Sequence, residues 1–129
     1  MQAASGRARV RFDRDALAED LARLSDAGRT AISRAQEEFK LEGVPIERLR
    51  ACEDAHPSGT RLPGCMKLYV PDWDGRWRIV FQIAMDSEGA LLTYLASGIG
   101  HQPRGARAPS AYQIAHHRLH GRWPRRAVR

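Results

Sequence analysis

Arg76 and Arg78 flank Trp77 in this sequence, and their spacing suits the binding of an anion. Two arginines two positions apart on a strand project from the same face of a sheet. A guanidinium can bind a phosphate through two parallel hydrogen bonds, so such a pair could hold a phosphodiester. The alternative is a solvated sheet face, which is the commoner setting for arginine.

Histidines form two further groups. His101 follows residues 98–100 (Gly-Ile-Gly), and an imidazole at such a loop titrates near neutral pH and can act as a general acid or base. His116 and His120 share one helical face, on a segment that also carries Tyr112. Tyr112 either packs in the core or faces a ligand. The histidine pair lacks the glutamate of an HExxH motif and evident further ligands, so we expect no metal site.

Other classes of site leave no pattern in the sequence. There is no Gly-rich phosphate loop, no Ser-His-Asp arrangement and no acidic metal cluster, so we expect no cofactor and no covalent nucleophile. Cys52 and Cys65 flank a Pro/Gly/Ser stretch at a spacing that matches no zinc motif. Two reduced thiols are the favoured interpretation, and a disulfide across that stretch is the alternative.

Charge is distributed unevenly along the 129 residues. The net charge is +6, yet residues 89–129 contain seven arginines and no Asp or Glu, and residues 1–88 carry a net charge of −1. Such asymmetry indicates a nucleic acid or an acidic protein as partner. No apolar stretch has the length of a membrane span and the N-terminus lacks a signal-peptide core, so we expect a cytoplasmic protein.

Hydrophobic periodicity predicts an α+β fold. We expect a strand at residues 8–12, a helix from Asp13 or Asp15 to about Leu24 closed by Gly28, and a helix at about 31–41. Strands should follow at residues 65–70, 77–85 and 90–96, with a last helix at about 111–120 capped by Ser110. Residues 43–64 are expected to be irregular. The resulting architecture is a two-layer domain at residues 1–121, in which a helical hairpin packs on a small antiparallel meander sheet. Residues 122–129 form a basic tail that is either ordered or disordered in the free protein.

The order of these elements, together with four short segments, resembles the RelE/ParE toxin superfamily of bacterial toxin–antitoxin modules. The segments are VRFDRDALAEDLARL, DGRWRIVFQI, ALLTYLASGIGHQ and SAYQIAHHRLHG, and the resemblance spans residues 8–121. It implies a RelE-like fold. The lysine pair of many ribosome-dependent members is missing here.

The resemblance also implies catalytic residues and a metal-free reaction. Arg78 matches the arginine of the central strand, with Arg76 assisting, His101 matches the acid or base after the last strand, and Tyr112 is similar to the C-terminal tyrosine. In such enzymes the 2′-hydroxyl of RNA attacks the adjacent phosphate, an acid protonates the leaving 5′-oxygen, and arginine stabilises the developing charge. An acidic antitoxin and RNA or the ribosome are the implied partners.

Two alternatives to an endoribonuclease remain open. One is a non-catalytic module on the same scaffold, either a gyrase-type inhibitor or an inert partner-binding domain. The other is a basic nucleic-acid-binding protein. The binding module would contact its partner through Arg104, Arg107, Arg125 and the helical hairpin. For RNA, the expected contacts are Arg104, Arg107, Arg118 and Arg122.

If the basic tail binds nucleic acid, affinity should fall steeply with salt, because each neutralised phosphate releases counterions. Removing residues 122–129 should then weaken binding and flatten the slope of log affinity against log salt. Fluorescence anisotropy with a short RNA at several salt concentrations measures both. An unchanged slope after truncation would exclude the tail as the binding element.

Overall fold

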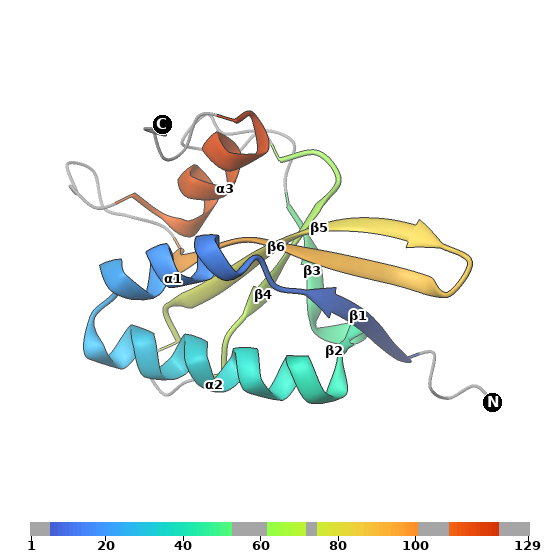
Figure 1. Ribbon diagram of the computed structural model, residues 1–129, viewed down its shortest axis with the longest axis horizontal. Helices are drawn as coiled ribbons and strands as arrows, with labels where there is room; N and C mark the ends of the chain where they lie inside the picture. The colour runs from blue at the N-terminus through green and yellow to red at the C-terminus, as the bar shows by residue number, and fades with distance from the viewer. Residues whose placement is uncertain (1–5, 53–61, 72–74, 101–108, 122–129) are drawn as a thin grey trace.

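The computed structural model describes residues 6–52, 62–71, 75–100 and 109–121. Within these ranges, three helices, one 3₁₀ turn and six strands follow one another (Figure 1). In order they are β1 (Arg7–Arg11), α1 (Arg14–Arg23), α2 (Asp26–Glu42), β2 (Val44–Pro45), η2 (Ile46–Arg48), β3 (Leu49–Ala51), β4 (Cys65–Tyr69), β5 (Trp77–Asp86), β6 (Gly89–Ile99) and α3 (Ala111–Leu119). None of the described helices is long and apolar enough to cross a membrane.

Side-chain caps define the helix starts. Asp13 accepts a hydrogen bond from the backbone N–H of Ala16, and Ser25 accepts one from that of Gly28. These caps satisfy N–H groups that have no partner inside a helix. The prediction that Gly28 closes the first helix was wrong, because Gly28 lies in the first turn of α2. Its missing side chain makes room for Trp77: a Cβ there would lie 2.6 Å from the Trp77 ring.

The sheet contains six strands in the order β2-β1-β6-β5-β4-β3. The predicted meander is confirmed, since β4, β5 and β6 pair antiparallel in sequence order. β1 then pairs parallel to β6, which makes the sheet mixed. The expectation that residues 43–64 are irregular was wrong for residues 44–51, where β2 pairs with β1 and β3 pairs with β4. These strands are only two and three residues long, too short for alternation to be seen in the sequence.

The register between β5 and β6 shifts once. Val80 lies opposite Ala96 and Phe81 lies opposite Tyr94, so Leu95 is an extra residue on β6. A bulge of this kind leaves the inserted residue out of the regular ladder and turns the strand. It explains why Tyr94 and Ala96, two residues apart, belong to different clusters of buried side chains.

Helices cover both faces of the sheet (Figure 1). α1 and α2 lie on one face, where Ile32, Phe39, Ile79 and Phe81 belong to the larger core. α3 lies on the other face over a smaller core, whose buried members are Leu62, Cys65, Val80, Ala96, Ala111, Tyr112, Ile114 and Ala115. β5 is therefore buried on both sides from Ile79 to Phe81. The fold is α+β, and α3 adds a layer to the two that were expected.

Replacing Gly28 with alanine should lower the free energy of unfolding by about 2 kcal/mol, because the new methyl group overlaps the buried ring of Trp77. The sign is diagnostic, since Gly→Ala in a helix without such a contact stabilises by about 1 kcal/mol. Urea denaturation measures the difference, with Thr30→Ala on the exposed side of the same helix as control. A Gly28→Ala protein more stable than wild type would contradict this packing.

Candidate functional site

Four side chains gather on the face of the sheet that α3 covers, and we call Lys67, Tyr69, Arg78 and Tyr112 the Arg78 cluster. Lys67 and Tyr69 alternate with the core residues Met66 and Leu68 along β4 and project to the opposite face. Tyr69 lies directly opposite Arg78 on β5. The strand register thus brings one cation and one ring from neighbouring strands together.

Arg78 is held in place by contacts on several sides. Its guanidinium lies 4.0 Å from the centre of the Tyr69 ring, within the range of a cation–π contact. One terminal nitrogen donates to the backbone carbonyls of Gly75 and Trp77, at 3.1 Å each. The side chain also hydrogen-bonds Tyr112. Among the described residues the buried Nε of Arg78 makes no hydrogen bond.

Tyr112 reaches the cluster from the first turn of α3. A capping box fixes that turn: Ser110 accepts from the Gln113 backbone N–H, and the Gln113 side chain accepts from the Ser110 N–H. Ser110 is thus the N-cap, as predicted. The Tyr112 side chain is buried, with 2 % of the residue exposed. Burial raises the pKa of Tyr112, and the nearby Arg78 only partly offsets this, so the phenol is protonated at neutral pH and can donate a hydrogen bond.

The Arg78 cluster carries positive charge that no carboxylate among the described residues neutralises. Within the part of the chain that the structure describes, neither Lys67 nor Arg78 forms an ion pair. The Lys67 ammonium lies 5.8 Å from the centre of the Tyr69 ring and 5.5 Å from that of Tyr112. Two cations over two tyrosines, with Tyr69 52 % exposed, suit a ligand that combines negative charge with a flat apolar surface.

Gly100 brings the end of the last strand against Arg78. Its N–H donates to the carbonyl of Arg76, and a Cβ at this position would lie 3.1 Å from Nε of Arg78. Gly100 immediately precedes His101, which lies outside the described residues, as do the predicted RNA-binding residues Arg104, Arg107 and Arg122.

Arg76 does not join Arg78. It precedes β5, its guanidinium lies 5.6 Å from the centre of the Trp77 ring, and it lines a separate cleft of about 250 Å³. The other side chains at this cleft come from the end of α1, the end of β6 and the start of α3. The structure therefore separates the two arginines that the sequence placed on one face.

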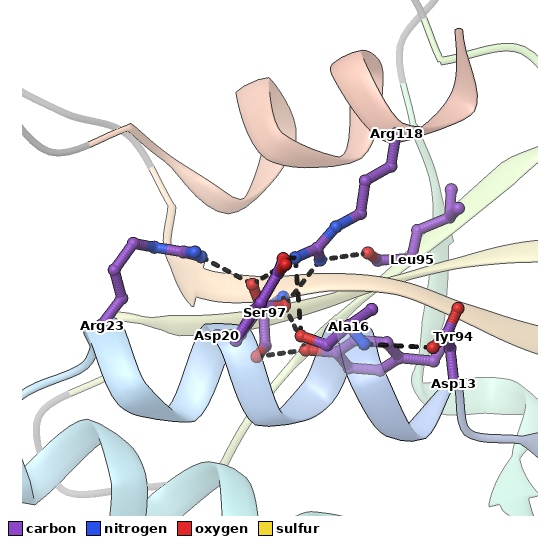
Figure 2. Close-up of polar contacts among 9 residues, drawn as sticks. Asp13, Ala16, Asp20, Arg23, Tyr94, Leu95, Ser97 and Arg118 are labelled. Carbon is purple, nitrogen blue, oxygen red and sulfur yellow. Dashed lines mark hydrogen bonds and ion pairs between the residues drawn. The ribbon is translucent and has the colours of Figure 1, made fainter. Parts of the chain in front are cut away.

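Arg118, predicted to bind RNA, has an internal role that corrects that expectation. Its side chain is 9 % exposed and its two terminal nitrogens each lie 2.9 Å from an oxygen of Asp20, a carboxylate that is fully buried (Figure 2). Arg118 also donates to Glu19 and to the carbonyl of Leu95. A guanidinium engaged in this way is not available to a phosphate.

The buried carboxylate of Asp20 joins three elements. From α1 it accepts hydrogen bonds from Tyr94 and the Ser97 N–H on β6, from Arg118 on α3, and from Arg23 one turn along its own helix. Burial and the negative charge of Asp20 raise the pKa of Tyr94, which keeps this phenol protonated as a donor. Burial alone would lower the pKa of Arg118, but its bonds to Asp20 outweigh this effect and the guanidinium stays charged.

The histidines of α3 do not form a metal site within the described structure. His116 and His120 do share a face, with ring centres 4.6 Å apart, and His117 lies 5.6 Å from His116. No group of three or more ligating side chains occurs among the described residues.

Sequence reasoning missed three contributors. Lys67 and Tyr69 were visible as the alternating positions of a predicted strand, but only the register with β5 sets them beside Arg78. Asp20 had a weaker signal: it lies three residues after Leu17 on the apolar face of its helix, where a carboxylate needs a buried partner.

Comparison with known proteins gives one similarity. No family model and no curated protein matches the sequence. Among solved structures, the chain is similar to the E. coli toxin RelE, determined in the free state as a variant with two arginines replaced by alanine. The two share 22 % identity over 72 % of this chain and 83 % of that chain, with a TM-score of 0.36. Values this low assign no role to individual residues.

Replacing Asp20 with asparagine should cost about 3–5 kcal/mol of stability, because it leaves Arg118 buried without its counter-charge. Glu19→Gln is the matched control, since Glu19 contacts the same arginine from the exposed side of α1 and should cost less than about 1 kcal/mol. Denaturant unfolding measures both, and hydrogen exchange should show faster exchange in α3 for the Asp20 variant. Equal effects of the two substitutions would show that the buried carboxylate does not anchor the helix.

Proposed function

We propose that this chain is a toxin of the RelE/ParE type that cleaves RNA at the Arg78 cluster without a metal ion. The observation that carries the proposal is the pairing of two cations that lack carboxylate partners among the described residues, Lys67 and Arg78, with a protonated phenol, Tyr112, on one face of the sheet. Such a set can bind a phosphate, stabilise added negative charge and donate a hydrogen bond.

Each residue has a distinct role in this proposal. Arg78 holds the scissile phosphate, and its stacking on Tyr69 and its bonds to backbone carbonyls limit its movement while charge develops. Lys67 supplies the second positive charge.

Two proton transfers complete the reaction. A base removes the proton of the RNA 2′-hydroxyl, which attacks the phosphorus, and an acid protonates the departing 5′-oxygen. Tyr112 is the proposed donor, because a phenol is protonated at neutral pH; burial raises its pKa further, so it gives up its proton only to a strong base such as the departing 5′-oxygen. His101 is the proposed partner, since its neighbour Gly100 packs against Arg78.

The proposed biological setting is a toxin–antitoxin module. An acidic antitoxin chain would fold over the basic surface and block access of RNA or the ribosome to the cluster. Arg104, Arg107 and Arg122 are proposed contacts for either partner, and residues 122–129 are proposed as a basic tail of the single domain at 1–121. Arg118 is not among the proposed RNA contacts. Arg76 is proposed to assist only from outside the Arg78 cluster, where it lines its separate cleft.

A non-catalytic binding module is the second candidate, favoured by the burial of Tyr112. With 2 % exposure its phenol touches solvent very little, as expected if the tyrosine only anchors α3. In that case the Arg78 cluster would bind an anionic partner without breaking a bond.

Cleavage should depend on individual members of the cluster. We expect Arg78→Ala to lower the cleavage rate by about 10²–10³-fold, the effect of removing one preorganised donor, and Tyr112→Phe and His101→Ala by at least about 10²-fold. Arg34→Ala, which removes the same charge from the exposed face of α2, should leave the rate unchanged. The measurement is tightly induced expression with mapping of new 5′ ends in cellular RNA. Growth arrest without new ends would favour the binding module, and full activity of Arg78→Ala with His101→Ala would overturn the enzyme assignment.

Gly100→Ala tests the geometry rather than the chemistry. The added methyl group would lie 3.1–3.4 Å from three atoms of the Arg78 side chain, so the guanidinium must move by a few tenths of an ångström. We expect stability to change by less than about 1 kcal/mol, because the contacted side chain can shift, and cleavage to fall about tenfold or more, since small misplacements of catalytic groups are costly. Wild-type cleavage in this variant would show that Arg78 need not sit where the structure places it.

A further inference from the structure

Cys52 and Cys65 face each other across two antiparallel strands. The register of β3 and β4 pairs Arg50 with Lys67 and Ala51 with Met66. Continuing it by one residue sets Cys52 opposite Cys65, and the Cys52 N–H does donate to the Cys65 carbonyl, at 3.1 Å. Opposed residues that share such a hydrogen bond in antiparallel strands have Cα atoms about 5.5 Å apart, within the span of about 4.4–6.8 Å that a disulfide bridges.

Both thiols also lie on the same face of the sheet. Cys65 is a buried member of the core beneath α3, and Cys52 packs against that core from the edge. Opposed residues of an antiparallel pair project their side chains to one side, so the two sulfur atoms lie on the same side of the two strands. Strand pairing, a backbone hydrogen bond and a shared core thus bring together the two cysteines, whose pairing the sequence left open.

We propose that Cys52 and Cys65 form a reversible disulfide when the protein meets a low-molecular-weight disulfide such as oxidised glutathione. The Cys52 thiolate attacks one sulfur of the oxidant and releases one thiol, which leaves a mixed disulfide on Cys52. The Cys65 thiolate then attacks the Cys52 sulfur and releases the second thiol. The protein loses two protons and two electrons, and both pass to the two thiols released.

The order of the two steps follows from exposure. Cys52 is partly exposed and can meet the oxidant, whereas Cys65 is 3 % exposed and donates weakly to the carbonyl of Pro63. Burial, with a smaller effect of Cys52, raises the pKa of Cys65 to about 12, so few Cys65 side chains are thiolates at neutral pH. At pH values below this pKa, the rate of the closing step should therefore rise about tenfold for each unit by which the pH is raised.

The proposed bond would link the edge of the sheet to the core under the Arg78 cluster. It closes a loop from residue 52 to residue 65 and fixes β3 on β4, beside the strand residues Lys67 and Tyr69. Cys52 is close enough to Tyr112 that its charge raises the pKa of that phenol. The disulfide site does not depend on the proposed RNA cleavage and can be tested without it.

The test compares the purified full chain in native buffer and in urea, each equilibrated with mixtures of reduced and oxidised glutathione. Free thiols are then alkylated, and linked peptides are identified by mass spectrometry. We expect a peptide that joins Cys52 to Cys65 within one molecule. The equilibrium constant for forming this disulfide from glutathione should be roughly 100-fold larger in the native protein than in urea. A disulfide that fits the fold and closes a loop of this length stabilises the folded state by about that factor.

Thermal unfolding gives a second readout on matched variants. Oxidation should raise the Tm of the wild type by roughly 10 °C and leave Cys52→Ser and Cys65→Ala unchanged. Cys52→Ser changes only the partly exposed residue, so it serves as the folded control if Cys65→Ala fails to fold. An equilibrium constant no larger in the native protein than in urea, or disulfides formed only between molecules, would overturn the proposal.

Discussion

The fully buried carboxylate of Asp20 is the constraint on which the placement of α3 depends. A buried charge is costly unless every lone pair has a partner, and here donors come from β6, from α3 and from the same helix. Because the donors on β6 and α3 are far from Asp20 in sequence, the carboxylate can be satisfied only when α1, β6 and α3 are assembled together (Figure 2). Arg118 and Tyr112 then fix the two ends of one short helix, the first to this carboxylate and the second to Arg78.

The positive charge of the Arg78 cluster results from strand geometry. Alternation along β4 sends Lys67 and Tyr69 away from the larger core, and the register with β5 puts Tyr69 opposite Arg78. Stacking on the Tyr69 ring attracts the guanidinium without neutralising it, whereas a carboxylate would cancel the charge that an anion needs. Arg118 shows the opposite case: once paired with Asp20 it contributes to stability and is lost to ligand binding.

Much of this fold could be predicted from the sequence because its signals are local. The alternating strands at residues 65–70, 77–85 and 90–96, the Ser110 cap and the helical hairpin each depend on neighbours within a few residues. The start of α2 also has a local signal, the Ser25 cap, but Gly28 three residues later was predicted to be a helix end. Why a glycine lies inside this helix is set by Trp77, about fifty residues away. Contacts between residues distant in sequence also determine the partners of Lys67, the separation of Arg76 from Arg78 and the internal role of Arg118. These features depend on strand register or on a buried contact, so the sequence alone could not predict them.

A hydrophobic pair of similar volume often stabilises a core as well as a buried ion pair does. In this protein such a replacement would leave backbone groups unsatisfied. The bulge at Leu95 takes that residue out of the β5–β6 ladder, and its carbonyl accepts from Arg118 at 2.7 Å. The N–H of Ser97, two residues on, donates to Asp20 at 3.0 Å. The ion pair therefore serves as the hydrogen-bonding partner of an irregular strand. The same bulge turns Ala96 toward α3 and Tyr94 toward α1, so the irregularity that requires the charges also sets which residues of β6 face each helix layer.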